Sequence, residues 1–164
     1  IVERSDPDRA GLTTAGFVTL AKWSDLCVGG GCEDAPGGEM TTDARRIHQA
    51  AISASLPILE RALEEWGLDY GEIDYAIPHQ TSARAIASGG RRFSKHFHAA
   101  PGEVVVNLEE YGNTASTSHF LALYGLLKER RIEPGENIML MALASGIVIG
   151  VVGFTMDELA ARYG

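Results

Sequence analysis

The sequence has few basic residues, few cysteines and no apolar run long enough to cross a bilayer. Its 164 residues include 14 Lys and Arg against 22 Asp and Glu, which gives a net charge of −8. Nucleic-acid binding normally requires a basic face, and the densest cationic group here is only Arg91, Arg92 and Lys95. The longest apolar stretch, 138–154, is interrupted by Gly and Ser, which favours two buried strands. We therefore expect neither a nucleic-acid partner nor a membrane partner.

The two cysteines, Cys27 and Cys32, lie in the segment CVGGGC with four residues between them. A zinc site would need a second pair of ligands at short spacing, and the sequence offers none, so no metal site is predicted. Neither cysteine stands beside an evident base or at an evident helix start, which favours a structural role over a redox or nucleophilic one. So few cysteines suit a reducing compartment, and we expect a cytoplasmic protein.

Strands and helices are predicted to alternate along the chain. Five segments are rich in β-formers or continuously apolar and are predicted strands: 15–24, 74–78, 103–108, 138–143 and 147–154. Three segments are predicted helices: 42–66, 82–96 and 114–131. The glycine-rich segment 28–40 is predicted to be a loop. This alternation implies an α/β layered domain, with a mixed, mostly parallel five-stranded sheet flanked by helices.

The helix predicted for 42–66 has the clearest periodicity. Thr41 or Thr42 is expected to cap its start, and Gly67 is expected to end it. Pro57 falls inside the pattern, so a kink or break is predicted near Leu56. Its apolar stripe consists of Ile52, Leu56, Leu59, Leu63 and Trp66.

Two further burial patterns are predicted. The valine run in 103–108 suggests a strand buried on both faces. The helix 114–131 is predicted to carry Leu121, Tyr124 and Leu127 or Lys128 along one side.

Three polar features follow predicted strands, where ligands bind in open α/β sheets. His79 follows 74–78, Asn113 follows 103–108 after a short turn, and the segment 142–146 (ALASG) follows the next strand. An imidazole can donate a hydrogen bond or act as an acid or base, and an Asn amide offers two donors. A backbone N–H in the Ser-Gly turn can stabilise an oxyanion. Taken singly, His79 also fits a structural role and Asn113 a helix cap.

The other histidines are predicted to lie outside the site. His96 and His98 are two positions apart on a helix and face different ways, so shared metal ligation is not expected. His48 and His119 are expected to be surface or packing residues.

Taken together, the motifs resemble the C-terminal half of β-ketoacyl-acyl carrier protein synthase III, a thiolase-fold condensing enzyme. They are AIPHQTSARAI (76–86), YGNTASTS with its Asn 34 residues after His79, and GENIMLMALASGIVIG (135–150). The resemblance covers about residues 40–154. It implies that residues 1–164 form the second half of a thiolase-like fold. The chain begins on two apolar residues without Met, and we expect it to belong to a longer protein.

The resemblance implies roles for individual residues. His79 and Asn113 match the family histidine and asparagine that hold a malonyl thioester carbonyl while CO2 leaves. The family's nucleophilic cysteine belongs to the other half of the fold, so neither Cys27 nor Cys32 is assigned to it. The Ser145 N–H would complete an oxyanion hole, although the sequence LASG (143–146) replaces the family's aromatic residue and glycines.

The resemblance also implies partners. Arg84 matches a basic position that contacts the acidic carrier protein, and the nearby cations extend that docking patch. Ser82 stands where the family often has an Asn that contacts the pantetheine arm. Substrates would be thioesters of acyl carrier protein or coenzyme A, among them a malonyl thioester, with no cofactor. The full-length protein is expected to be a homodimer.

Three functions stay open on the sequence. The first is decarboxylative Claisen condensation of an acyl thioester with a malonyl thioester, in fatty-acid or polyketide biosynthesis. The second is transfer of an acyl group to an alcohol or amine, which the retained Asn113 disfavours. The third is a non-catalytic subunit that shapes a site in another chain. The isolated fragment is expected to be inactive in condensation because the nucleophile lies elsewhere.

Overall fold

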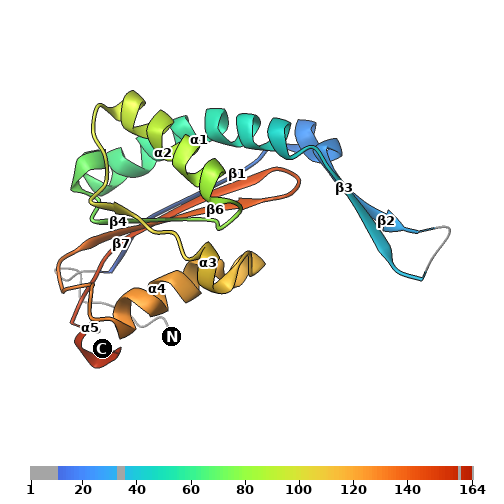
Figure 1. Cartoon of the computed structure of the whole chain (residues 1–164). Coiled ribbons are helices and arrows are strands. Elements are labelled where there is room, and N and C mark those ends of the chain that lie inside the picture. The colour runs from blue at the N-terminus through green and yellow to red at the C-terminus, as the bar shows by residue number, and fades with distance from the viewer. Residues whose placement is uncertain (1–10, 33–35, 159, 164) are drawn as a thin grey trace.

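The computed structural model describes residues 11–32, 36–158 and 160–163. Its main element is a five-stranded sheet in the order β1-β7-β6-β4-β5 (Figure 1). The strands are β1 (Leu12–Thr19), β4 (Tyr75–Pro78), β5 (Glu103–Val104), β6 (Asn137–Ala144) and β7 (Val148–Thr155). β4 pairs in parallel with β5 and β6, whereas β7 is antiparallel to both β6 and β1. Four strands therefore run in one direction and only β7 opposes them, which confirms the predicted mixed, mostly parallel sheet.

Helices cover both faces of this sheet. In Figure 1, α1 (Ala44–Trp66) and α2 (Ala83–Phe97) lie on one side, while α3 (Leu108–Tyr111) and α4 (Ser118–Lys128) lie on the other. Neighbouring strand residues supply the two cores alternately, because successive side chains point to opposite faces. Met139 packs with Leu59 and Leu63 on the α1 side, whereas Ile138 packs with Leu126 on the α4 side. A short helix, α5 (Ala160–Tyr163), follows β7.

The apolar stripe predicted for the long helix is confirmed, but the predicted break is wrong. Leu59 is fully buried, and Leu56 and Trp66 pack against the same core. The helix continues through Pro57, which is exposed, as is Ser53 one turn earlier. At Pro57 the helix lacks the hydrogen bond to the Ser53 carbonyl, and water can bind that carbonyl because both residues are exposed.

The helix caps differ slightly from those predicted. Asp43, not Thr41 or Thr42, is the N-cap of α1, and its Oδ1 accepts the Arg46 N–H at 3.0 Å. Gly67 ends the helix as predicted, with φ 74° in the left-handed region that glycine adopts freely.

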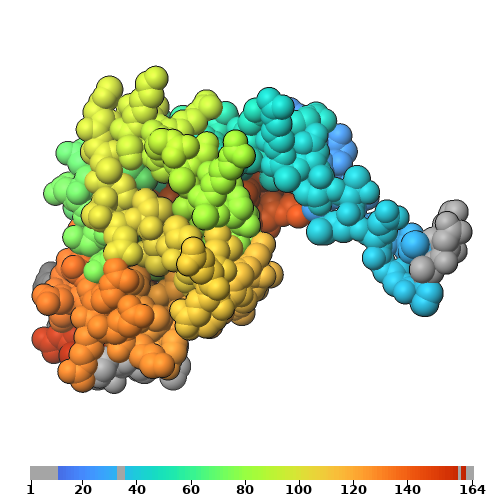
Figure 2. Space-filling model, in the orientation of Figure 1, coloured from blue at the N-terminus to red at the C-terminus, as the bar shows by residue number. Residues whose placement is uncertain are grey.

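The segment predicted as a loop forms a β-hairpin instead. β2 (Cys27–Gly31) pairs antiparallel with β3 (Gly38–Thr42), and both threonines belong to β3. A 3₁₀ helix, η1 (Ala21–Leu26), leads into it and occupies the end of the predicted first strand. Figures 1 and 2 show the hairpin projecting from the body of the molecule. The sequence did not indicate this pairing, because β2 is rich in glycine and exposed and has no alternating apolar face.

Three other predictions are corrected on the α4 side of the sheet and in the segments that lead to it. β5 has two residues at the edge of the sheet, and Val106 is 46% exposed, so this segment is not buried on both faces. The predicted turn after it contains α3. Residues 114–131 begin with the 3₁₀ helix η3 (Ala115–Thr117), and α4 buries Ala122 and Leu126 whereas Tyr124 is exposed.

None of the helices in the described part of the chain is long and apolar enough to span a membrane.

Gly153 gives a test of the packing between β7 and α1. A Cβ on Gly153 would overlap the Trp66 ring and lie 2.9 Å from Cγ2 of Thr14. Gly153→Ala should therefore lower the free energy of unfolding by about 1–3 kcal/mol, the usual cost of overpacking. Gly30→Ala in β2 is the matched control, because its Cβ would meet nothing within 4 Å. Urea denaturation of both variants makes the comparison, and equal midpoints would contradict the packing described.

Candidate active site

Two of the predicted site features, His79 and the turn that contains Ser145, lie at one edge of the sheet. β4 and β6 are parallel, so His79 after β4 and the turn after β6 lie at the same edge. The backbone extends the pairing by one step, because the His79 N–H donates to the Met141 carbonyl at 2.8 Å. The Thr81 N–H then donates to the His79 carbonyl at 3.0 Å and turns the chain toward α2.

The ring of His79 stacks on His119 from α4. The ring centroids are 5.8 Å apart and the ring planes meet at 24°. The Nε2 of His119 donates to the same Met141 carbonyl at 3.0 Å. Burial, and secondarily the charge of His119, lower the pKa of His79 from its usual 6.5. The imidazole of His79 is therefore held neutral at neutral pH, which suits a hydrogen-bond donor.

His119 was expected to be a surface or packing residue, and sequence reasoning missed its contact with His79. The side chain is buried, with 7% of its surface exposed. No spacing in the sequence links positions 79 and 119. Only the packing of α4 against β4 brings them together.

Gln80 fixes the loop that carries His79. Its side chain is fully buried and makes three hydrogen bonds. Nε2 donates to the carbonyls of Pro78 at 2.9 Å and Val105 at 3.1 Å, while Oε1 accepts the Asn107 N–H at 3.1 Å. β5 ends at Val104, and beyond it the Gln80 side chain takes the place of sheet hydrogen bonds. It thereby holds the end of β4 to the segment that follows β5.

Asn113 lies in the connection between α3 and η3 and is exposed. Its Oδ1 accepts the Ala115 N–H at 2.9 Å, a local turn that orients the amide. The N-cap of α4 is Thr117, so Asn113 does not cap that helix. With its oxygen engaged in this way, the amide has its Nδ2 to offer to a ligand.

Ser145 lies in the turn between β6 and β7, where the hairpin of β2 and β3 reaches it. Hydrogen bonds from Ser145 and then Thr42 lower the pKa of the Cys27 thiol. The Cys27 Sγ lies 3.4 Å from Oγ1 of Thr42. The glycine-rich segment thus places a thiol beside the turn that was predicted to supply an oxyanion-hole N–H, a contact that the sequence did not indicate.

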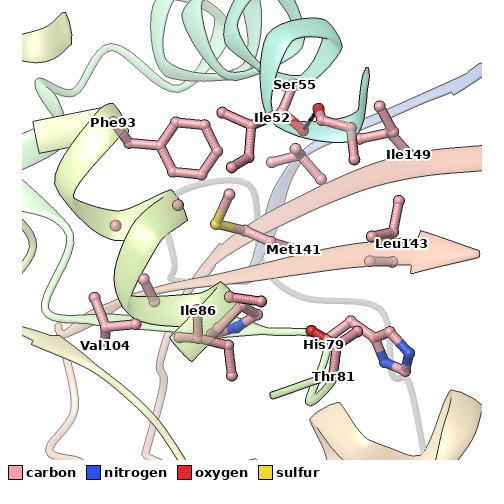
Figure 3. A pocket seen from close by; sticks show the side chains of 18 of the residues that line it. Ile52, Ser55, His79, Thr81, Ile86, Phe93, Val104, Met141, Leu143 and Ile149 are labelled. Atoms are coloured by element: carbon pink, nitrogen blue, oxygen red, sulfur yellow. Dashed lines mark hydrogen bonds between the residues drawn. The ribbon is translucent and has the colours of Figure 1, made fainter. Parts of the chain in front are cut away.

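An apolar cavity of about 90 Å³ lies between α1, α2 and the sheet, with His79 on its border. Figure 3 shows Ile52 and Phe93 from the helices and Met141 from β6 gathered around it, and His79 at one end. Ala85, Gly89 and Gly90 of α2 also line it. Because these side chains are small or absent, α2 leaves room for a ligand chain next to the imidazole.

The predicted partner-binding residues lie on α2. Ser82 is its N-cap, and the Ser82 Oγ accepts the Ala85 N–H at 3.1 Å. Arg84 is exposed in the first turn of α2. Arg91 follows seven residues later and Lys95 four residues after that, so the three lie on the same side of the helix. α2 contains no acidic residue, so this side is uniformly cationic.

The histidines at the other end of α2 make separate contacts. His96 Nε2 lies 2.7 Å from Oε1 of Glu60 on α1, and His98 ends α2 in the left-handed conformation. They do not share a partner in these contacts.

Comparison with known proteins gives matches to one family. A family model described as "3-oxoacyl-[acyl-carrier-protein (ACP)] synthase III C terminal" matches residues 63–156. β-Ketoacyl-[acyl-carrier-protein] synthase III of Bradyrhizobium diazoefficiens is 29% identical over 157 residues, which are 92% of this chain and 47% of that protein. The Symbiobacterium thermophilum enzyme of the same name is 37% identical over 111 residues, 68% of this chain and 29% of that protein. The chain thus spans less than half the length of these relatives.

Solved structures show the same fold. The 3-oxoacyl-(acyl carrier protein) synthase III of Pseudomonas aeruginosa superposes with a TM-score of 0.78 at 22% identity, covering 94% of this chain and 47% of that one. OleA of Xanthomonas campestris gives a TM-score of 0.74 at 25% identity, covering 92% and 42%. The predicted thiolase-like architecture is confirmed by these superpositions.

Replacing Gln80 tests the clamp on the His79 loop. Gln80→Leu would leave the Asn107 N–H and the Val105 carbonyl without their partners and should lower the free energy of unfolding by about 2–4 kcal/mol. Gln49→Leu on the exposed side of α1 is the matched control and should stay within about 0.5 kcal/mol of the wild type. Thermal or urea denaturation measures both, and a stable Gln80→Leu protein would contradict a clamping role.

His79 should make stability depend on pH. Above its usual pKa of 6.5 neither state binds the proton, so His79 has no effect. Below that value the unfolded chain takes up the proton more readily than the native one, so native stability falls as the pH drops. His79→Asn should remove this component, so the gap between wild type and variant should change between about pH 6.5 and 5. Urea midpoints across that range test it, and parallel curves would show that the pKa is not shifted.

Proposed function

The chain belongs to the family of 3-oxoacyl-[acyl-carrier-protein] synthase III C-terminal domains, and from this membership we propose that it supplies the decarboxylating part of a condensing active site. The observation that carries the proposal is His79, held neutral at the end of β4 on the border of an apolar cavity. A neutral imidazole donor is what a developing enolate oxygen needs.

The proposed reaction is a decarboxylative Claisen condensation. The bond between the malonyl α-carbon and its carboxylate breaks, CO2 leaves, and the electron pair passes into the thioester as an enolate. Nε2–H of His79 and Nδ2–H of Asn113 stabilise the enolate oxygen. The carbanion then attacks an acyl group on a cysteine thioester, forms the new carbon–carbon bond, and the cysteine leaves as thiolate. We propose that this cysteine comes from residues outside the 164 of this chain.

Ser145 is proposed to serve the second half of this reaction. Attack on the acyl thioester produces a tetrahedral oxyanion, which a fixed backbone N–H stabilises well. The turn between β6 and β7 supplies that N–H at the edge of the sheet where His79 lies. The Ser145 side chain also lies beside the Cys27 thiol and lowers the pKa of that thiol.

The proposed substrates are thioesters of acyl carrier protein or coenzyme A. The Bradyrhizobium and Symbiobacterium relatives are named for acyl carrier protein, and the OleA structure contains lauric acid and lauroyl-CoA. The cationic side of α2 with Arg84, Arg91 and Lys95 fits an acidic carrier protein electrostatically. Ser82 is occupied as a helix cap, so its proposed contact with a pantetheine arm would have to use the oxygen's remaining bonding capacity. Homodimer formation and a cytoplasmic location stay predictions.

The test uses the intact protein that contains this chain. With a labelled acyl thioester and a malonyl thioester, it should release CO2 and form a β-ketoacyl product. His79→Ala and Asn113→Ala should each lower the rate about 10²–10³-fold by removing an enolate donor. Because the pKa of His79 is lowered, the rate should fall only at a pH below its usual 6.5, where the native imidazole becomes protonated.

The exposed His98→Ala is the matched control and should keep the wild-type rate. CO2 release that is indifferent to both site variants would overturn the assignment. Acyl transfer to an alcohol or amine without CO2 would favour the acyltransferase, and no turnover in the presence of both substrates would favour a non-catalytic subunit. The isolated 164-residue chain should release no CO2.

A further inference from the structure

The imidazole of His79 has no hydrogen bond that would fix its orientation. Its backbone N–H and carbonyl are both engaged, with the Met141 carbonyl and the Thr81 N–H. Neither ring nitrogen bonds a group among the described residues, and neither is enclosed as a buried polar atom. In an active imidazole, a hydrogen bond to one ring nitrogen commonly orients the other. The plane of this ring must therefore be set by a different contact.

The ring of His119 makes that contact. Its centroid lies 5.8 Å from that of His79 and the ring planes meet at 24°, within the range of stacked aromatic pairs. His119 is itself fixed, because it is buried and its Nε2 donates to the Met141 carbonyl. That carbonyl also accepts the His79 N–H, so both histidines are anchored at one atom. Stacking uses the face of the His79 ring and leaves its edge, which carries both nitrogens, open to a ligand.

His119 belongs to the same segment as Asn113, the other proposed enolate donor. Asn113 precedes η3, and His119 is the second residue of α4. The hydroxyls of Thr114 and Ser118, which lie between them, are 3.2 Å apart and connect the start of the segment to the helix. The packing of α4 against β4 thus sets the His79 ring and the Asn113 turn relative to each other.

We propose that His119 is a positioning residue whose stacked ring holds the plane of the His79 imidazole, so that the edge with Nε2 faces the substrate oxygen. The inference rests on the proposed function, since that function requires a directed donor at His79. It goes further by assigning the direction of the donor to α4. A ring that could turn freely about its side-chain bonds would present Nε2 to the oxygen only part of the time.

His119 also affects the proton affinity of His79. Burial, and then the charge of His119, lower the pKa of His79. Other titratable groups lie on the neighbouring elements and do not contribute to this lowering: His48 on α1, Arg84 on α2, Glu109 and Glu110 on α3, and Cys27 on β2. A substitution that removes the charge at position 119 should therefore raise the pKa of His79 toward 6.5, whether or not it keeps a ring.

Two apolar variants separate the ring of His119 from its other properties. His119→Phe and His119→Leu both lose the charge and the bond to Met141, but only phenylalanine keeps a flat ring against His79. In the intact protein at about pH 8, His119→Leu should lower kcat for CO2 release about tenfold, because the donor is no longer directed. KM for the malonyl thioester should stay within about twofold of the wild type, and His119→Phe should recover most of kcat.

NMR of the purified chain gives a readout that does not depend on turnover. Both variants should raise the pKa of His79 toward its usual 6.5. The ring-current shift of the His79 ring protons should persist in His119→Phe and disappear in His119→Leu. Ala122→Gly is the matched control, because this buried residue lies on the same helix and glycine weakens the helix there. It should lower stability and leave both kcat and the His79 pKa unchanged.

Equal kcat values in the two His119 variants would overturn the inference, because the ring would then not be what directs His79. A tenfold loss of kcat in His119→Phe, or a ring-current shift that survives in His119→Leu, would overturn it as well. The proposed function survives these failures if His79→Ala still slows CO2 release. If the wild type releases no CO2, the proposed function fails, and the ring-current shifts alone decide whether His119 orients His79.

Discussion

One backbone carbonyl, that of Met141, determines the geometry of the site. It accepts the His79 N–H at 2.8 Å and His119 Nε2 at 3.0 Å, so a single acceptor positions a histidine from each of two elements. The bond to His79 depends on the parallel pairing of β4 with β6, which sets Pro78 opposite Met141, and the bond to His119 depends on the packing of α4. A register slip of one residue would turn the side chains of β4 to the other face and separate the two rings. The chemistry proposed for His79 therefore depends on strand pairing before it depends on any side chain.

The electrostatic character of the site follows from the same arrangement. Partial burial and the facing ring of His119 both disfavour a proton on His79, and the cavity beside it is lined mainly by apolar groups. A neutral donor in a weakly polar site stabilises a developing negative charge more strongly than it would in water. Cations lie on the outer side of α2, where they can attract an acidic partner without charging the site. Electrostatic attraction of a partner and the chemistry at His79 are thus assigned to different parts of the molecule.

The sequence predicted the parts of the site that local patterns encode. His79 follows an apolar strand after a proline, and the alternation of strands and helices places such an end at the ligand-binding edge. The contacts that support His79 could not be predicted, because they join residues far apart in sequence. Gln80 bonds Val105 and Asn107, and His119 meets His79 only after α4 packs on the sheet. The β2–β3 hairpin was missed because its glycines give no alternating pattern, although its strands pair over five positions.

The cavity itself results from what α2 omits. Gly89 and Gly90 lie in the interior of a helix, where each glycine costs about 1 kcal/mol relative to alanine. Neither requires glycine on conformational grounds, since neither has a positive φ. A Cβ on Gly89 would lie 3.8 Å from Ile52 in ordinary contact, and one on Gly90 would meet nothing within 4 Å. Alanine would therefore fit at both positions and fill part of the space beside Ile52 and His48. Because both positions carry glycine, α2 gives up stability there, and the cavity beside His79 keeps the space that alanine side chains would fill.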